Sequence, residues 1–128
     1  RMGGDLVYKY VNDLQIRANS IDQSVAQLSG GNQQKVVFAK SLAAEPKILL
    51  LDDPTVGVDI ATKRDIFQIV RRIASQGNGV IYISSEMEEL AELCDRVLVL
   101  RRGRLVQELV QCEGDFITEE ALMSAIQR

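Results

Sequence analysis

The run KILLLDD, residues 47–53, constrains the fold of this chain more than any other segment. It is a short, continuous apolar run that ends in two carboxylates, Asp52 and Asp53. Such runs are typical of strands buried on both faces of a parallel sheet, whereas half-buried strands alternate apolar and polar residues. We therefore expect a buried strand that carries its two acidic residues to the carboxyl edge of a sheet, where open α/β sheets bind ligands.

The segments on either side of this run alternate between helix and strand. A helix is expected from the LSGG motif to about Ala44, and Pro46 marks its end. After the run, Asp59 can cap a helix that ends at Gly77. A second apolar strand, VIYIS, follows at residues 80–84. This alternation predicts an α/β domain with a mostly parallel sheet.

The C-terminal third predicts two more helices and a hairpin. Ser85 and Glu88 have the spacing of a capping box before a short amphipathic helix. The segment RVLVLRRGRLVQELV, residues 96–110, reads as two strands that turn at Gly103, and we expect them to be antiparallel. Thr118 can then cap a closing helix that has two glutamates in its first turn, where negative charge suits the helix dipole.

The motif LSGGNQQKV, residues 28–36, places a serine and two glycines at a helix start. The first backbone N–H groups of a helix have no intrahelical acceptor, and glycines let a bulky anion approach them, so the motif suits a phosphate. By itself it also fits an ordinary flexible turn with a serine cap. The carboxylate of Asp52 favours the phosphate site over the ordinary turn, because a magnesium ligand beside a phosphate site indicates a nucleotide.

Composition narrows the class of protein. The 128 residues include 15 basic and 18 acidic side chains, and the basic ones are scattered, which argues against a nucleic-acid-binding surface. Two cysteines without a CxxC pair, and no histidine, suggest neither a zinc site nor a disulfide framework, and they suit a reducing cytosol. No apolar run approaches the roughly 20 residues of a membrane-spanning helix, although the chain could still dock on a membrane protein.

The segment LSGGNQQKVVFAKSLAAEPKILLLDDPTVGVD, followed by DRVLVLRRGR, resembles the ATP-binding cassette proteins. The resemblance is closest to the second cassette of bacterial sugar-import ATPases. In that family LSGG is the signature motif, ILLLD is the Walker B strand, GVD around Asp59 is the D-loop, and the end of VIYISS is the switch region. The resemblance implies a partial P-loop NTPase fold: a mostly parallel sheet flanked by helices, with a C-terminal β-hairpin and helix.

The phosphate-binding loop of that family is missing from this chain. No Gly-Lys dipeptide occurs, so the Walker A pattern cannot be placed. We therefore expect residues 1–128 to be the C-terminal part of a cassette within a longer polypeptide. Residues 1–45 would form the helical and signature segment, and residues 46–128 would hold Walker B, the D-loop, the switch region and the tail. The isolated fragment is expected not to hydrolyse ATP.

The resemblance also assigns roles to individual residues. Cassettes of this family pair head to tail around two ATP molecules, so the signature would clamp the γ-phosphate of ATP held by the partner cassette. Asp52 would hold Mg²⁺ on the nucleotide of its own cassette, with capping of the next turn as the simpler alternative. Asp59 could cross the dimer interface or only cap its helix, and both can hold. The residues placed at the nucleotide are Ser29, Gly30, Gly31, Asn32, Gln33 and Asp59.

Two expected catalytic positions depart from the family pattern. Asp53 stands where the family usually has a glutamate that polarises the attacking water, and aspartate is one methylene shorter. Its simpler interpretation is a surface carboxylate. Ser85 occupies the place of the switch histidine; it can donate a hydrogen bond but cannot become charged, and we favour its capping role. We expect the site on this Walker B to hydrolyse slowly, while the signature completes a competent site on the partner.

The function implied is that of an ATP-hydrolysing subunit of a sugar importer at the cytoplasmic face of the bacterial inner membrane. Its cofactors would be ATP and Mg²⁺. Its partners would be a second cassette, transmembrane permease subunits and, indirectly, a sugar-binding protein, with no nucleic acid. Two alternatives stay open: a soluble cassette ATPase of translation or DNA repair, and a non-catalytic interaction module that uses the acidic segment EMEELAEL.

Overall fold

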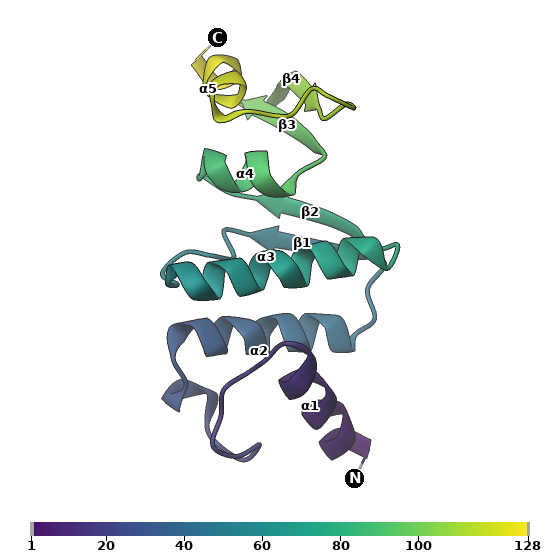
Figure 1. Ribbon diagram of the computed structural model, residues 1–128, viewed down its shortest axis with the longest axis vertical. Helices are drawn as coiled ribbons and strands as arrows, with labels where there is room; N and C mark the ends of the chain where they lie inside the picture. The colour runs from purple at the N-terminus through teal and green to yellow at the C-terminus, as the bar shows by residue number, and fades with distance from the viewer. Residues whose placement is uncertain (1, 128) are drawn as a thin grey trace. The chain divides into compact units, whose positions relative to one another are not determined.

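A computed structural model of the protein describes residues 2–127. The chain forms two compact units, one that ends at Ile81 and one that begins at Tyr82. The elements up to that boundary are α1 (Met2–Asp13), the 3₁₀ turn η1 (Val25–Gln27), α2 (Gly30–Ala43), β1 (Ile48–Asp52) and α3 (Ile60–Ser75). Strand β2 (Gly79–Ile83) contains the boundary itself. The second unit continues with α4 (Met87–Leu93), β3 (Arg96–Arg101), β4 (Arg104–Val110) and α5 (Glu119–Gln127) (Figure 1).

Helices α2 and α3 of the first unit begin and end where the capping residues predict. Ser29 is the N-cap of α2, and Ala44 ends that helix. Asp59 is the N-cap of α3, and its carboxylate accepts the backbone N–H of Thr62 at 2.7 Å. Gly77 follows the end of α3 with a φ of 90°, a left-handed conformation that favours glycine. These boundaries are therefore confirmed.

The core of the first unit is formed by α2, α3 and β1. Helices α2 and α3 run side by side in Figure 1, and Phe38 of α2 is only 2% exposed. One face of α3 is buried, and in β1 every second residue is buried. These buried side chains are Leu49, Leu51, Ile66, Phe67, Ile69, Val70 and Ile73.

Strand β1 is buried on one face only. Leu49 and Leu51 are buried, whereas Ile48 and Leu50 are 64% and 63% exposed. The expectation of a strand covered on both faces is therefore wrong for this chain. Because α3 covers only one side of the strand, the apolar residues that point the other way have no helix against them in the described chain. Ile81 of β2 is also exposed.

The strands form two separate two-stranded sheets. Strands β1 and β2 pair in one sheet, joined by the crossover through α3, and their arrows run in the same direction in Figure 1. Strands β3 and β4 pair in antiparallel register, with Arg102 and Gly103 in left-handed conformations at the turn. The α/β class and the C-terminal hairpin are confirmed. The parallel sheet consists of β1 and β2, and the hairpin forms a sheet of its own.

The second unit has a small core of its own. Val97, Ile117 and Leu122 are buried there, and Leu90 of α4 and Cys94, the C-cap of that helix, pack against them. Thr118 caps α5 as predicted, because its hydroxyl accepts the backbone N–H of Ala121 at 3.1 Å. Within residues 2–127, no helix combines the length and the apolar character that crossing a membrane requires.

The predicted capping box at Ser85 is not formed. The N-cap of α4 is Glu86, one residue later, and the Glu86 side chain makes no capping hydrogen bond. Ser84 serves the turn instead, because its hydroxyl accepts the backbone N–H of Glu86 at 3.0 Å. A box needs its glutamate at the third helical position, and with Glu86 as N-cap that position belongs to Glu89 rather than to Glu88.

Candidate nucleotide site

The signature turn at the start of α2 is the centre of the candidate site. Ser29 is exposed, and its hydroxyl oxygen accepts two hydrogen bonds from Asn32: one from the backbone N–H at 3.3 Å and one from Nδ2 at 2.9 Å. Gly30 and Gly31 are the first two helical residues, whose N–H groups have no intrahelical acceptor in an α-helix. The turn therefore offers an exposed group of hydrogen-bond donors at the positive end of a helix.

The two glycines of the signature have different structural environments. A Cβ added to Gly31 would lie 2.6 Å from both Cγ2 and Oγ1 of Thr62. A Cβ on Gly30 would meet nothing closer than the carbonyl oxygen of Gly57, at 4.0 Å. Gly31 is thus required by the packing of α2 against α3, whereas the backbone of Gly30 stays open to an approaching group.

Thr62 joins the signature to the expected D-loop. Its side chain contacts Gly31, and its backbone N–H is bound by the Asp59 carboxylate. That hydrogen bond to the ionised form lowers the pKa of Asp59. Two motifs that are 28 residues apart in the sequence therefore meet at one threonine. Thr62 was not among the residues predicted for the site, although its place three residues after an aspartate N-cap marks it as the cap's partner.

Asn32 connects the signature to the preceding loop, and Gln33 makes a hydrogen bond back to the first residue of the signature. The Asn32 side-chain oxygen accepts the backbone N–H of Arg17 at 2.9 Å, and Gln33 Nε2 donates to the carbonyl of Leu28 at 3.0 Å. A cavity of about 400 Å³ lies beside this loop, and Ser29 is part of its wall. The other lining residues are Ile16, Arg17, Ala18, Asn19, Gln23, Gln27 and Leu28.

A buried lysine holds the signature helix against α3. Lys35 is 5% exposed, and its Nζ lies 2.7 Å from Oδ2 of Asp65. The same ammonium group also donates to the carbonyl of Gln15 at 3.3 Å. One cation thus links α2, α3 and the loop that follows α1. This ion pair was not predicted from the sequence, because a lysine in a polar stretch carries no signal of burial.

The two carboxylates at the end of β1 have different surroundings. Asp52 is the last residue of the strand and is exposed. Asp53 is half-buried and has a φ of 45°, a left-handed conformation that aspartate tolerates better than most residues. Its carbonyl accepts the N–H of Val56 at 3.3 Å, so it begins the turn toward Asp59. Across residues 2–127, no three His, Cys, Asp or Glu side chains gather as a metal cluster.

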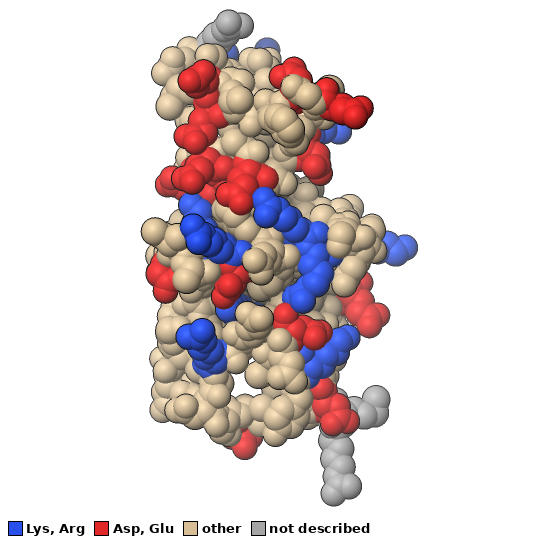
Figure 2. All heavy atoms as spheres, in the orientation of Figure 1, with Lys and Arg blue, Asp and Glu red and all other residues tan. Residues whose placement is uncertain are grey.

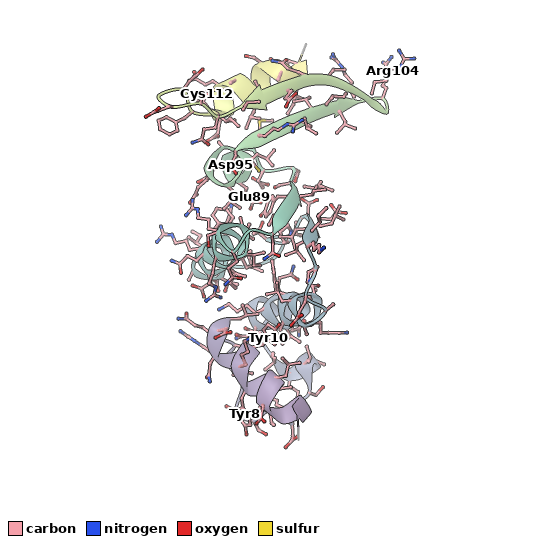
Figure 3. All side chains as sticks on the ribbon, turned by 90° about the vertical axis from the view of Figure 1, so that its right-hand side faces the viewer. Tyr8, Tyr10, Glu89, Asp95, Arg104 and Cys112 are labelled. Carbon is pink, nitrogen blue, oxygen red and sulfur yellow. The ribbon has the colours of Figure 1, made fainter. Side chains whose placement is uncertain are left out.

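The switch segment of the second unit is organised around a buried carboxylate. Glu89 is 1% exposed, and its Oε2 accepts hydrogen bonds from the hydroxyls of Tyr82 and Ser84, both at 2.8 Å (Figure 3). Acidic side chains gather over α4 in Figure 2, yet Glu89 belongs to the core rather than to that face. Ser85 itself is exposed. The burial of Glu89 was not predicted from the sequence, because a glutamate within an acidic run is typical of a solvated surface.

The comparison with known families agrees with the motifs. Residues 5–56 match the ABC transporter family. The chain is 52% identical over 110 residues to the ribose import ATP-binding protein RbsA 2 of Agrobacterium fabrum, an alignment that covers 86% of this chain and 21% of that protein. It is 46% identical over 121 residues to ribose import ATP-binding protein RbsA of Geobacillus kaustophilus, covering 94% of this chain and 24% of that protein.

Solved structures with the same fold are ATP-binding cassettes. A dimeric post-hydrolysis state of the cassette MJ0796, bound to ADP and phosphate, superposes with a TM-score of 0.72 at 26% identity and covers 83% of this chain and 46% of that one. The cassette MJ1267 of an ABC transporter has a TM-score of 0.78 at 21% identity, covering 99% and 47%, which shows the fold alone.

The fold and the signature geometry define this chain as part of an ATP-binding cassette of the ABC transporter family. Within that family it is similar to the ribose import ATP-binding proteins. The resemblance stated from the motifs is therefore confirmed. The chain spans about a fifth of the length of the curated relatives it matches.

Proposed function

We propose that this chain is part of the ATP-hydrolysing subunit of a bacterial sugar importer, and that its signature turn completes an ATP site held by a second cassette. The donor geometry of the signature turn carries the proposal. The terminal phosphate of ATP presents oxygen acceptors, and the turn offers the Ser29 hydroxyl with the N–H groups of Gly30 and Gly31. The names of the curated relatives support a sugar as the transported solute.

Within the proposed site the remaining residues have distinct tasks. Asp52 would hold Mg²⁺ on the nucleotide of its own cassette, since magnesium in such sites takes one or two carboxylates together with phosphate oxygens. The bound metal would neutralise charge on the phosphates. Asp53 would orient the attacking water and Ser85 would donate to the phosphate, while Asp59 would serve both its helix and the interface with the second cassette.

The partners follow from the same proposal. A second cassette would supply the phosphate-binding loop that faces this signature, and the dimeric form of MJ0796 supports such pairing. Transmembrane permease subunits at the cytoplasmic face of the inner membrane would receive the energy of ATP binding, and a sugar-binding protein would deliver the solute. The apolar side chains of Ile48 and Leu50, exposed here, fit a strand that further chain covers in a longer protein.

The proposal is tested by substituting the signature serine in the full-length gene product. Ser29→Ala removes the hydroxyl donor, and we expect Mg²⁺-dependent ATP hydrolysis to fall about tenfold or more, as for a lost hydrogen bond to a charged group. Ser41→Ala is the matched control, because Ser41 lies in the same helix and donates only to the carbonyl of Val37. Equal rates in the two variants, or a full-length product that binds no ATP, would overturn the proposal.

The slow-site hypothesis for Asp53 has a separate test. If the missing methylene of Asp53 keeps its carboxylate from the attacking water, Asp53→Glu in the full-length product should raise the turnover number of that site. Asp53→Asn, which keeps the size and removes the charge, should lower it. An unchanged turnover number in Asp53→Glu would refute the hypothesis that this site hydrolyses slowly because its carboxylate is short.

A further inference from the structure

The side chain of Asn32 determines what the Ser29 hydroxyl can do. We propose that Asn32 is a positioning residue that leaves the Ser29 hydroxyl able to act only as a hydrogen-bond donor, directed at a phosphate oxygen. This inference rests on the proposed function, because the phosphate is the one that the signature turn would bind. It assigns Asn32 to the serine rather than to the nucleotide itself.

The orientation of the Asn32 amide is fixed by its neighbour. The backbone N–H of Arg17 can only donate, and it lies 2.9 Å from one end of the amide. That end must therefore be the carbonyl oxygen, since an NH₂ group cannot accept. The other end is consequently the NH₂ group, and it lies 2.9 Å from the Ser29 oxygen. The loop residue Arg17 thus determines which polar group faces the serine.

Two hydrogen bonds to one hydroxyl oxygen use both of its lone pairs. Ser29 Oγ accepts from Nδ2 of Asn32 and, as an ordinary N-cap does, from the backbone N–H of Asn32. A hydroxyl has two acceptor positions and one donor, so only its O–H remains for another group. An ordinary serine cap keeps one lone pair and could also accept from a donor.

This arrangement selects for anions before any ligand arrives. Ser29 is exposed and borders the cavity beside the loop, so its O–H can reach a bound group. Both neighbours of the oxygen are donors, which turns the hydroxyl proton away from them. A phosphate oxygen therefore meets a hydroxyl that is already oriented, and less rotational freedom is lost on binding.

The inference is tested by a double-mutant cycle in the full-length gene product. The variants are Ser29→Ala, Asn32→Ala and the double substitution. The readouts are the dissociation constant for the non-hydrolysable analogue AMP-PNP with Mg²⁺, the kcat and KM for ATP, and the melting temperature. We expect Asn32→Ala to weaken AMP-PNP binding several-fold when Ser29 is present and to change it little when Ser29 is already alanine. A loss through the loop contact with Arg17 would instead persist in both backgrounds.

A second variant keeps the test valid if Asn32→Ala unfolds. Asn32→Asp is isosteric, and one carboxylate oxygen still accepts the N–H of Arg17. The other oxygen replaces the NH₂ group that faces Ser29, so it accepts the hydroxyl proton of Ser29 where the NH₂ group donated to the hydroxyl oxygen. The effect of Asn32→Asp should exceed that of Ser29→Ala, about tenfold or more, because the new carboxylate also repels the phosphate. The part that is transmitted by the serine should disappear in the Ser29→Ala background, so the effect should be smaller there.

The outcomes separate the two proposals. Equal effects of an Asn32 substitution in both backgrounds would overturn the positioning role and leave the proposed function intact. A Ser29→Ala variant that binds AMP-PNP and hydrolyses ATP like the unmodified protein would overturn both.

Discussion

Gly31 packs directly against Thr62, with room for a hydrogen atom but not for a methyl group: an added Cβ would lie 2.6 Å from two atoms of the threonine side chain. Threonine is branched at Cβ and cannot easily turn away. Contact between the first turn of α2 and the first turn of α3 therefore depends on this glycine. The missing side chain at Gly31 therefore serves two purposes: it leaves the backbone open to a phosphate, and it lets α2 pack against α3.

We predict that the two signature glycines respond differently to alanine. Gly31→Ala should destabilise the protein by about 1–3 kcal/mol, the cost of overpacking a close contact. Gly30→Ala should change stability little, because its Cβ has room. Adding Thr62→Ala to Gly31→Ala should recover part of the loss. Urea unfolding of the four proteins checks this, and equal losses for the two glycines would contradict the packing interpretation.

In the buried Lys35–Asp65 ion pair, replacing the aspartate should lower the free energy of unfolding more than replacing the lysine. Asp65→Asn leaves a buried ammonium group without its counter-charge, and we expect a loss of about 2 kcal/mol. Lys35→Met replaces the cation by an apolar side chain of similar length and should cost less, because Asp65 is partly exposed and can be solvated. The measurement is the free energy of unfolding in denaturant. A larger loss for Lys35→Met would show that the pair itself is the main stabilising element.

The cap at Asp59 should make the stability of α3 depend on pH. The hydrogen bond from Thr62 lowers the folded-state pKa of Asp59, so the carboxylate stabilises the protein above the ordinary pKa of 3.8. That contribution is lost as the pH falls from 3.8 through the lower, folded-state pKa. The melting temperature of the protein should therefore exceed that of Asp59→Ala at pH 6, and this difference should narrow below pH 3.8.

A serine at the same position separates charge from capping. Asp59→Ser keeps a side-chain acceptor for the Thr62 N–H but has no charge to titrate. The melting temperature of Asp59→Ser should exceed that of Asp59→Ala by the same amount from pH 6 to pH 3. If the difference in melting temperature between Asp59→Ser and Asp59→Ala narrowed at low pH as much as the difference between the unmodified protein and Asp59→Ala, the pH dependence would come from another group.

The buried carboxylate of Glu89 should be among the costliest side chains to remove from the second unit. Glu89→Leu takes the shared acceptor from the hydroxyls of Tyr82 and Ser84, and we expect a loss of about 2–4 kcal/mol. The exposed neighbour Glu88 offers a matched control, and Glu88→Leu should stay within about 0.5 kcal/mol. Chemical denaturation measures both. Similar small losses would mean that the hydroxyls find other acceptors.

The two cysteines, which are both free thiols, should differ in reactivity. Burial raises the pKa of Cys94, and the adjacent carboxylate of Asp95 raises it further, so little thiolate forms near neutral pH. Cys112 is exposed. Iodoacetamide at pH 8 should therefore alkylate Cys112 first, and peptide mass spectrometry locates the label. Cys94 should react at the rate of Cys112 only after denaturation, and early labelling of Cys94 would contradict its burial.

Local patterns in the sequence were sufficient for most of the secondary structure. The caps at Ser29, Asp59 and Thr118 were predictable because a side-chain oxygen that accepts an N–H three residues ahead is a local interaction. The cap at Ser85 failed by a single residue, because the neighbouring serine bonds a buried glutamate and moves the helix start.

The division of the chain was less predictable. The boundary between the compact units lies in the sequence of β2, between Ile81 and Tyr82. The expected segments 1–45 and 46–128 follow the motifs and stay a prediction. The same applies to the roles of the individual site residues, because a motif names the residue types that a reaction needs, not the contacts that those residues make.

By itself the sequence determined the family, the α/β class and the position of each motif, since these depend on residue order and spacing. Only the tertiary structure decided why Gly31 must be glycine, where Lys35 finds its charge partner and which end of the Asn32 amide faces Arg17. It also decided that one apolar face of β1 stays exposed in this chain. Each of these depends on contacts between segments far apart in the sequence, or on the absence of such contacts, and no local pattern encodes them.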